Sequence, residues 1–320
     1  MTIRLTRVSI SGLRHVSFGG MKELKVHQVD AFTDKLFGGN PTAVVRDADV
    51  LDDGEMRQIA REMNLSESVF LLPSDRADVK LRFFTPPGDE IKFCGHATVG
   101  ALYTIATQQL YGISSSGGRQ QLTVETNAGV LTTDLVCEGG NTPGIILDCP
   151  KIDLVPADYE LANVVSVMGL QDDQVDWDKP LMLERTNNYL YFAAPDIAAL
   201  ERIELDVRGA IEFAQDDHIV VFCVMTAQAL DAANHVHARG YAPLVGVPED
   251  PFTGSMQGGL AAYLAANDMI SADLSLIGSE QGHFIGRPGQ VGIEIVERAP
   301  EFRARMHACA VAVFETVLRL

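Results

Sequence analysis

Three short stretches of this sequence carry side chains suited to proton transfer, and each stands beside an apolar segment. Glu67 lies in a polar loop directly before the apolar run 69–72, His96 stands where a second apolar segment begins, and Asp250 precedes a third. A carboxylate held near apolar walls can have its pKa raised toward neutrality and then act as a general base. The alternative for Glu67 is an exposed residue at the start of a strand.

The stretch Cys94-Gly95-His96-Ala97-Thr98 opens a predicted apolar helix over about 96–110. A helix N-terminus favours anions and lowers the pKa of a cysteine, so Cys94 is a candidate nucleophile or proton carrier. His96 is either a proton shuttle or a residue whose hydrogen bonds fix the turn. Thr98 suits capping or packing better than reaction, and Gly95 allows close approach of the backbone to a ligand.

A related pattern returns downstream. Arg239-Gly240-Tyr241-Ala242-Pro243 repeats the Arg-x-aromatic-x-Pro spacing of Arg82-Phe83-Phe84-Thr85-Pro86, and it leads through Asp250 to Ser255 into another apolar helix. Asp250 could orient or protonate a substrate group while Ser255 hydrogen-bonds it, although both residue types are also common helix caps. The repeat indicates two similar halves that face each other across a cleft, each supplying one loop.

The sequence lacks the residues that several other kinds of reaction require. A two-thiol racemase needs a second cysteine opposite Cys94, and the segment 249–255 contains none. The sequence has no GxSxG, Walker or strand-linked GxGxxG pattern. His235 and His237 alternate on one predicted strand, but no carboxylate or cysteine can be assigned to them, so we expect no metal site.

Composition excludes some classes of partner. The chain of 320 residues has a net charge of −18, which repels nucleic acid and anionic lipid. No run of 18 apolar residues could form a membrane span, and the first twenty residues lack the features of a signal peptide. The chain has five cysteines, which is an odd number, and none of them has the spacing of a metal-binding motif. This favours free thiols and a cytoplasmic location.

Strands dominate the predicted elements, and the few helices are very apolar. This combination predicts an α+β fold in which mixed sheets wrap around buried helices. The segment 303–320 reads as two hairpin arms with a break near 312–315. The other predicted helices cover about 54–63, 157–168, 196–203, 210–214 and 260–267, and the other predicted strands cover about 25–32, 42–45, 69–72, 78–84, 121–125, 129–135, 144–147, 189–192, 218–225, 234–241 and 290–296.

Taken together, the motifs resemble the PhzF-like family of phenazine biosynthesis, within the diaminopimelate epimerase fold. They occur in the family's order from residue 22 to the C-terminus, so residues 1–20 fall outside the match and Met21 is the expected native start. The motifs are Val29-Asp30-Ala31-Phe32-Thr33, Gly39-Asn40-Pro41, Leu65-Ser66-Glu67, Phe84-Thr85-Pro86, Cys94-Gly95-His96-Ala97-Thr98-Val99-Gly100, Glu249-Asp250-Pro251-Phe252-Thr253-Gly254-Ser255, Gln281-Gly282 and Gly286-Arg287-Pro288-Gly289.

The resemblance implies two pseudo-symmetric domains, each a mixed sheet around a central helix, with the site in the cleft between them. Residues 21–148 with about 303–320 would form the first domain and 149–302 the second. The characterised family member is a cofactor-free isomerase of a dihydro-hydroxyanthranilate, and members are commonly homodimers. The implied acid/base is Glu67, with His96 and Asp250 beside it, and the implied substrate contacts are Asn40, Cys94, Gly95, Thr98, Thr253, Gly254 and Ser255.

The resemblance therefore favours a cofactor-independent isomerase of a small carboxylated, anionic metabolite. Two departures leave the substrate open: Cys94 resembles the epimerase branch of the fold, and 185–189 is not the small glycine-containing turn expected there. The alternatives are an amino-acid racemase or epimerase that depends on Cys94, and a metabolite-binding protein without catalysis.

Overall fold

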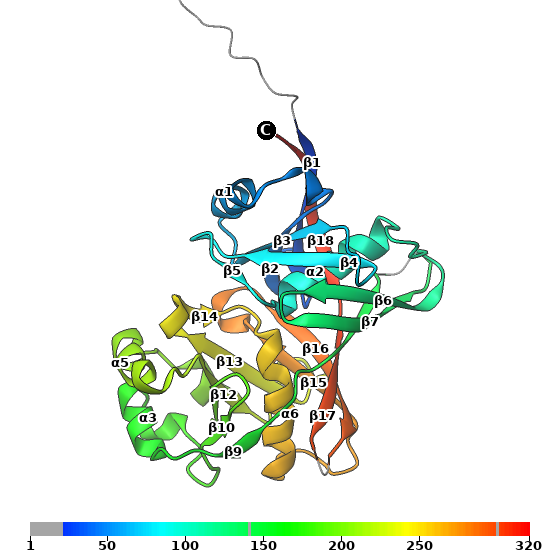
Figure 1. Ribbon diagram of the computed structural model, residues 1–320. Helices are drawn as coiled ribbons and strands as arrows, with labels where there is room; N and C mark the ends of the chain where they lie inside the picture. Colours follow the sequence, from blue (N-terminus) through cyan, green and yellow to red (C-terminus); the bar gives the residue numbers. More distant parts are fainter. Residues whose placement is uncertain (1–21, 140–141, 299–300) are drawn as a thin grey trace, which may run out of the picture.

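The computed structural model of the protein describes residues 22–139, 142–298 and 301–320 (Figure 1). The expected extension 1–20 and the proposed start at Met21 lie outside the described residues. The described part forms two halves, an upper and a lower one in Figure 1, and no helix in it is long and apolar enough to cross a membrane.

The first half follows the chain from β1 to β8. Its elements are β1 (Glu23–Ala31), β2 (Asn40–Val45), η1 (Ala48–Val50), α1 (Asp53–Met63), β3 (Glu67–Leu72), β4 (Val79–Phe84), β5 (Glu90–Ile91), α2 (Gly95–Thr107), β6 (Gly118–Thr126), β7 (Gly129–Cys137) and β8 (Gly144–Asp148).

The rest of the chain builds the second half and then returns to the first. Its elements are β9 (Leu154–Pro156), α3 (Leu161–Val167), η2 (Asp172–Gln174), β10 (Met182–Glu184), β11 (Tyr189–Ala193), α4 (Ile197–Glu201), α5 (Val207–Asp217), β12 (Val221–Thr226), β13 (Val236–Ala242), η3 (Pro243–Val245), β14 (Val247–Asp250), η4 (Gly254–Met256), α6 (Gln257–Ala266), β15 (Leu276–Gln281), η5 (His283–Ile285), β16 (Gly289–Glu297), β17 (Arg303–Ala308) and β18 (Ala310–Arg319).

The two halves have the same strand order. In the first half the pairs β1–β2, β2–β3, β3–β4, β4–β6, β6–β7 and β7–β8 are antiparallel, parallel, antiparallel, parallel, antiparallel and antiparallel in turn. The pairs β10–β11, β11–β12, β12–β13, β13–β15, β15–β16 and β16–β17 repeat this pattern in the second half. The predicted α+β fold with two pseudo-symmetric halves is confirmed.

Strands from the end of each half also pair with strands of the other half. β8 pairs with β17, so the two sheets continue into each other. β18 then runs back along β1, just as β9 follows β8 and pairs with β10 (Figure 1). Because β17 contacts strands of both halves, it belongs to neither alone, and the domain boundaries at 148 and 303 remain predictions.

The predicted hairpin in 303–320 is wrong. β17 and β18 are consecutive but pair with different strands, and the break between them falls at Cys309 rather than near 312–315. The register of β1 against β18 shifts at Gln28 and Val29, opposite 312–314, so the irregularity there is a bulge inside β18. Alternating sequence alone cannot distinguish a hairpin from one strand line that changes partners.

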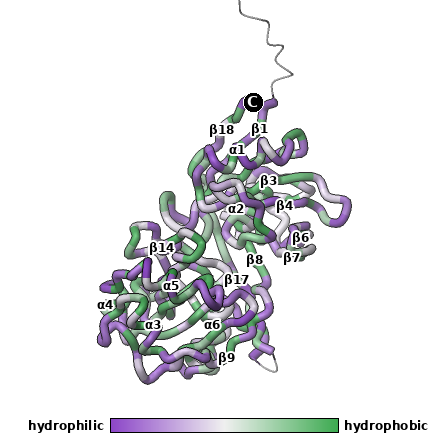
Figure 2. Tube along the Cα trace, turned by 60° about the vertical axis from the view of Figure 1, so that its left-hand side comes forward, coloured by the Kyte–Doolittle hydropathy of each residue, from purple (hydrophilic) through white to green (hydrophobic). Residues whose placement is uncertain are grey.

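A central helix lies against each sheet. α2 is buried on all sides, and α6 is buried over most of its length. Both packings depend on a glycine: a Cβ on Gly100 would lie 2.4 Å from Cγ2 of Thr42 on β2, and one on Gly259 would lie 2.4 Å from the hydroxyl of Tyr191 on β11. Hydrophobic stretches gather inside the two halves, and hydrophilic ones follow the outer loops (Figure 2).

The repeated arginine motif holds the same structure in both halves. Arg82 donates two hydrogen bonds of 2.7 Å to Glu90, and its guanidinium lies 5.2 Å from the ring centroid of Phe84. Arg239 donates bonds of 2.9 and 2.7 Å to Glu249 and stacks 5.2 Å from the ring of Tyr241. Each paired arginine fixes the loop that leads to its central helix.

Candidate active site

A cavity of about 600 Å³ lies between the loops that lead into α2 and α6. Its wall includes nearly all the site residues expected from the sequence. From the first half come Glu67, Cys94, Gly95 and His96, and from the second come Asp250, Thr253, Gly254 and Ser255. The cavity therefore draws on both halves.

Glu67, His96 and Cys94 form a compact group on the first-half side. Glu67 is the first residue of β3, where the Thr42 hydroxyl donates to its carbonyl oxygen at 2.9 Å. Oε2 of Glu67 lies 3.3 Å from Nε2 of His96, and Sγ of Cys94 lies 3.3 Å from Nδ1 of the same ring. The Cys94 thiol also hydrogen-bonds to Glu67. Each member contacts the other two.

Burial changes the charge state of this group. The Glu67 side chain is only 20% exposed. Burial and then the nearby carboxylate of Asp250 raise the pKa of Glu67 to about 7, although the hydrogen bond from Cys94 opposes the shift. Burial also lowers the pKa of His96 to about 4. Near neutral pH the imidazole is therefore uncharged, while Glu67 can either take up or release a proton.

The expectation of a low thiol pKa at Cys94 is wrong. Cys94 is the N-cap of α2, where the helix dipole favours a thiolate, but burial and then the carboxylate of Glu67 raise the pKa of this thiol well above its ordinary value. Desolvation and a neighbouring carboxylate outweigh the helix end. In the free protein Cys94 is a neutral thiol, which disfavours a role as a ready nucleophile.

Asp250 stands on the second-half side, in a dense set of hydrogen bonds. Asn40 donates to its Oδ1 at 2.8 Å, and the Thr253 hydroxyl donates to Oδ2 at 2.7 Å. Gln281 donates to its carbonyl oxygen at 2.8 Å. Burial raises the pKa of Asp250, while the bonds from Thr253 and Asn40 oppose this rise. These partners fix the carboxylate in one orientation.

Two expected substrate contacts lie behind the cavity wall. Asn40 is buried, and its amide donates to Asp250 and to the carbonyl oxygen of Phe252 at 3.0 Å. Thr98 is fully buried inside α2, where its hydroxyl donates to the carbonyl oxygen of Cys94 at 2.7 Å. Neither residue is part of the cavity wall. Their contacts position Asp250 and the turn at Cys94.

Sequence reasoning did not assign Tyr189 to the site. This residue begins β11, lines the cavity, and places its hydroxyl 2.8 Å from Oγ of Ser255. Burial raises the pKa of Tyr189, so the phenol stays neutral. The sequence did give one indication of this role. Residues 185–189, which end at Tyr189, stand where a small glycine-containing turn beside the substrate was expected, but they are not such a turn.

The turns at Gly95 and Ser255 face each other. A Cβ on Gly95 would lie 4.0 Å from the backbone nitrogen of Ser255. α2 begins at Gly95, whereas the second turn is the 3₁₀ segment η4, with α6 starting only at Gln257. The first N–H groups of a helix have no intrahelical acceptor, so this edge of the cavity suits an anion.

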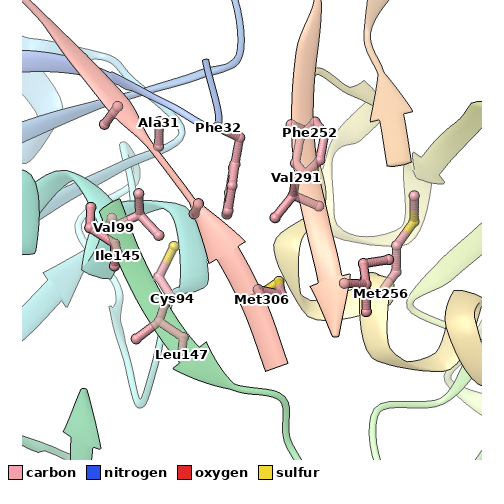
Figure 3. Close-up of a cluster of buried hydrophobic side chains, with 14 of the residues drawn as sticks. Ala31, Phe32, Cys94, Val99, Ile145, Leu147, Phe252, Met256, Val291 and Met306 are labelled. Carbon is pink, nitrogen blue, oxygen red and sulfur yellow. The ribbon is translucent and has the colours of Figure 1, made fainter. Parts of the chain in front are cut away.

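The halves are joined next to the cavity, whose wall includes Phe252, by apolar and charged contacts. The rings of Phe32 and Phe252 stack with centroids 4.6 Å apart, and Figure 3 shows them on either side of the junction. Arg287 donates to Asp30 at 2.8 Å and to the carbonyl oxygens of Gly38 and Gly39 at 2.7 and 2.9 Å. These contacts fix the distance between the two walls of the site.

Two clusters of described residues have side chains of the kinds that bind metals. The first is Glu67, Cys94 and His96, within the cavity, and the second is His237, Glu280 and His283. The sequence suggested no acidic partner for His237, but Glu280 lies 2.8 Å from its Nδ1. The two residues are 43 positions apart, so the sequence pattern around His237 gave no sign of this partner.

Comparisons with known proteins agree with this geometry. The sequence model of the family described as "Phenazine biosynthesis-like protein" matches residues 29–316. A trans-2,3-dihydro-3-hydroxyanthranilate isomerase of Pseudomonas fluorescens is 30% identical over 275 residues, which cover 85% of this chain and 91% of that protein.

Solved structures show the same fold. A PhzF-family phenazine biosynthesis protein of Bacillus anthracis is 26% identical with a TM-score of 0.83, covering 93% of this chain and 99% of that one. A hydroxyproline epimerase of Agrobacterium vitis is 12% identical with a TM-score of 0.59 and covers 93% of each chain, so it shows the shared epimerase-like fold alone. With this fold, the family match and the named relative in agreement, the chain belongs to the phenazine biosynthesis-like (PhzF) family and is an isomerase.

Proposed function

We propose that the protein is a cofactor-independent isomerase that moves a proton within a small carboxylated metabolite, with Glu67 as general acid and base. The observation that carries the proposal is the environment of Glu67. Burial beside Asp250 raises its pKa to about 7, so both of its protonation states are populated near neutral pH. A group with this property can remove a proton from carbon and then return it.

The reaction begins when the Glu67 carboxylate takes a proton from an activated carbon, and the electron pair of that C–H bond moves into the conjugated system of the substrate. The protonated Glu67 then gives the same proton to another carbon on the same face, so no atom is gained or lost. The neutral imidazole of His96, 3.3 Å away, offers a polar contact to the carboxyl group in both states.

The substrate class follows from the two turns that face each other across the cavity. The turns at Gly95 and Ser255 present backbone N–H groups and a hydroxyl, which suit a carboxylate. The relative from Pseudomonas fluorescens is named as an isomerase of trans-2,3-dihydro-3-hydroxyanthranilate, a cyclic carboxylated compound. We propose a compound of this kind as the substrate, held with its carboxylate between the two turns.

The test is proton–deuteron exchange in D₂O over cyclic carboxylated dienes and amino acids, with trans-2,3-dihydro-3-hydroxyanthranilate as the first compound. The wild type should catalyse exchange or isomerisation, and Glu67→Gln should lose it. The exposed Glu62→Gln is the matched control and should keep it.

Two other outcomes would support other functions. Exchange into an amino acid that survives Glu67→Gln but is lost in Cys94→Ser would support a Cys94-dependent racemase. If no ligand that thermally stabilises the protein undergoes exchange, a metabolite-binding role would replace the isomerase proposal.

A further inference from the structure

We propose that the side chain of Asn187 recognises a hydrogen-bond donor on the substrate, so that the protein selects carboxylated compounds that also carry an amino or hydroxyl group. This selectivity rests on the proposed function, because it requires a small carboxylate in the cavity. The contacts that carry it are those that fix the Asn187 amide at the cavity wall.

The buried carboxylate of Glu184 determines how Asn187 is oriented. Glu184 is the last residue of β10 and is only 2% exposed. Its Oε1 accepts from the backbone nitrogens of Asp153 and Thr186 at 3.1 and 2.9 Å. Its Oε2 accepts from the backbone nitrogen and from Nδ2 of Asn187, each at 2.9 Å. With four donors around it, this carboxylate fixes the turn that carries Asn187.

The amide oxygen of Asn187 remains available to a ligand. A carboxylate accepts hydrogen bonds and does not donate them, so the amide nitrogen has to face Glu184 and the oxygen has to face elsewhere. Among the described residues no donor contacts this Oδ1, and the atom is not enclosed by protein. Because Asn187 lines the cavity, it presents a fixed hydrogen-bond acceptor there.

The part of the cavity wall next to Asn187 is apolar. Val220 and Val221 line the cavity as well. Val220 adjoins the turn, since its backbone nitrogen donates to the carbonyl oxygen of Asn188 at 2.9 Å, and Val221 pairs with Tyr189 in the sheet. An acceptor in apolar surroundings discriminates strongly, because it loses its contact with water when a ligand without a donor covers it.

Other polar groups of the cavity are less suited to this selection. The hydroxyls of Tyr189 and Ser255, 2.8 Å apart, can each donate or accept, so they do not require a donor on the substrate. The carboxylate of Asp250 is an acceptor, but each of its oxygens already accepts a hydrogen bond from the protein. A substrate donor bound by Asp250 instead would make the selectivity independent of Asn187.

Binding of aromatic acids tests the selectivity without any reaction, because an aromatic ring does not undergo the proposed proton shift. The probes are benzoate and its three aminobenzoate isomers, with dissociation constants measured by calorimetry. The wild type should bind at least one aminobenzoate about fivefold more tightly than benzoate, which is the effect of one hydrogen bond. Asn187→Leu, which removes the acceptor and keeps a similar size, should lose this preference and bind benzoate as before. Asn163→Leu, at an exposed asparagine on α3, is the matched control and should keep the preference.

Asn187→Ala is a second variant without the acceptor, and thermal unfolding shows whether each variant is folded. A preference for an aminobenzoate that persists in both variants would overturn the role of Asn187. A wild-type protein that binds no aminobenzoate more tightly than benzoate, or that binds none of the four compounds, would overturn the selectivity itself.

The exchange assay in D₂O addresses the proposed function separately from these binding measurements. A preference that depends on Asn187, in a protein that catalyses no exchange, would leave the recognition standing while the proposed function fails. Exchange that depends on Glu67, together with a preference that does not depend on Asn187, would leave the isomerase standing and overturn the recognition.

Discussion

Oε2 of Glu67 lies 3.3 Å from Nε2 of His96, and burial moves the pKa values of these two residues in opposite directions. The carboxylate becomes a weaker acid and the imidazole a weaker base. Because its pKa falls to about 4, His96 stays uncharged at neutral pH and cannot form an ion pair with Glu67. A neutral partner leaves the pKa of Glu67 free to stay near 7, where proton transfer in both directions is efficient.

Glu67→Gln should make the protein more stable at high pH while removing activity. The pKa of Glu67 is raised in the folded state, so its contribution to stability is fully present below about pH 4.5 and is lost as pH rises through about 7. The loss above pH 7 is on the order of 3 kcal/mol. Relative to the wild type, Glu67→Gln should therefore gain free energy of unfolding between pH 5 and pH 8, as measured by urea denaturation.

The matched control for this experiment is Glu62→Gln, which alters an exposed carboxylate on α1. Its stability relative to the wild type should not change over the same range. A Glu67→Gln variant whose relative stability is also constant with pH would mean that Glu67 keeps an ordinary pKa.

Asp250→Asn should move the pH dependence of the reaction to lower pH. The wild-type kcat/KM should rise through about pH 7, because the reaction begins with the deprotonated Glu67. The Asp250 carboxylate contributes to the raised pKa of Glu67, so removing its charge should lower that pKa. The measurement is kcat/KM against pH for both proteins, and an inflection that stays in place or rises would contradict the role of Asp250.

Tyr189→Phe should weaken substrate binding more than it slows the chemistry. The change removes the hydroxyl 2.8 Å from Oγ of Ser255 and leaves the ring in place. Without this partner the Ser255 hydroxyl is no longer held in place, and loss of its proposed hydrogen bond to the substrate costs about 1 kcal/mol, so KM should rise roughly fivefold with little change in kcat. Tyr111→Phe, at an exposed residue, is the control. A fall in kcat at constant KM would instead place Tyr189 in the proton transfer.

Gly100→Ala should destabilise the first half, and Thr42→Ser should restore part of the loss. A Cβ at residue 100 would lie 2.4 Å from Cγ2 of Thr42, so α2 has to move away from β2. Overpacking of this kind costs about 1–3 kcal/mol, which exceeds the gain of about 1 kcal/mol in helix propensity. Serine lacks the Cγ2 and keeps the hydroxyl that donates to Glu67.

Chemical denaturation of the two single variants and the double variant measures this coupling. The double variant should be more stable than the sum of the single changes predicts. Strict additivity would show that the contact between α2 and β2 does not limit the approach of the helix.

The sequence was sufficient to predict those helices and loops for which the local hydrophobic pattern and a motif agree. The capped helix at 53–63, the apolar helices around 100 and 260, and the loops at Glu67, His96 and Asp250 were predicted near their places in the structure. Apolar content identifies a buried helix, and a turn motif identifies the loop before it. The expectations of a homodimer and a cytoplasmic location concern relations outside one chain and remain predictions.

What the sequence could not predict depends on contacts between distant segments. The pKa of Cys94 rises because of burial near Glu67, although the helix start alone predicts a fall. The pairing of Tyr189 with Ser255 joins residues 66 positions apart. The six-residue strand β15 and the short strands β5, β9, β10 and β14 have too little periodic pattern to be recognised and exist because neighbouring strands pair with them.

The account depends most on the charge state of Glu67, which can be measured without any substrate. Carbon-13 NMR of protein labelled at the glutamate carboxyl groups, with Glu67→Gln to assign the signal, gives this pKa directly. We predict a titration midpoint near pH 7 for Glu67 in the free protein. A midpoint near the ordinary glutamate value of about 4.3 would contradict the proposal that Glu67 is the acid/base of the reaction.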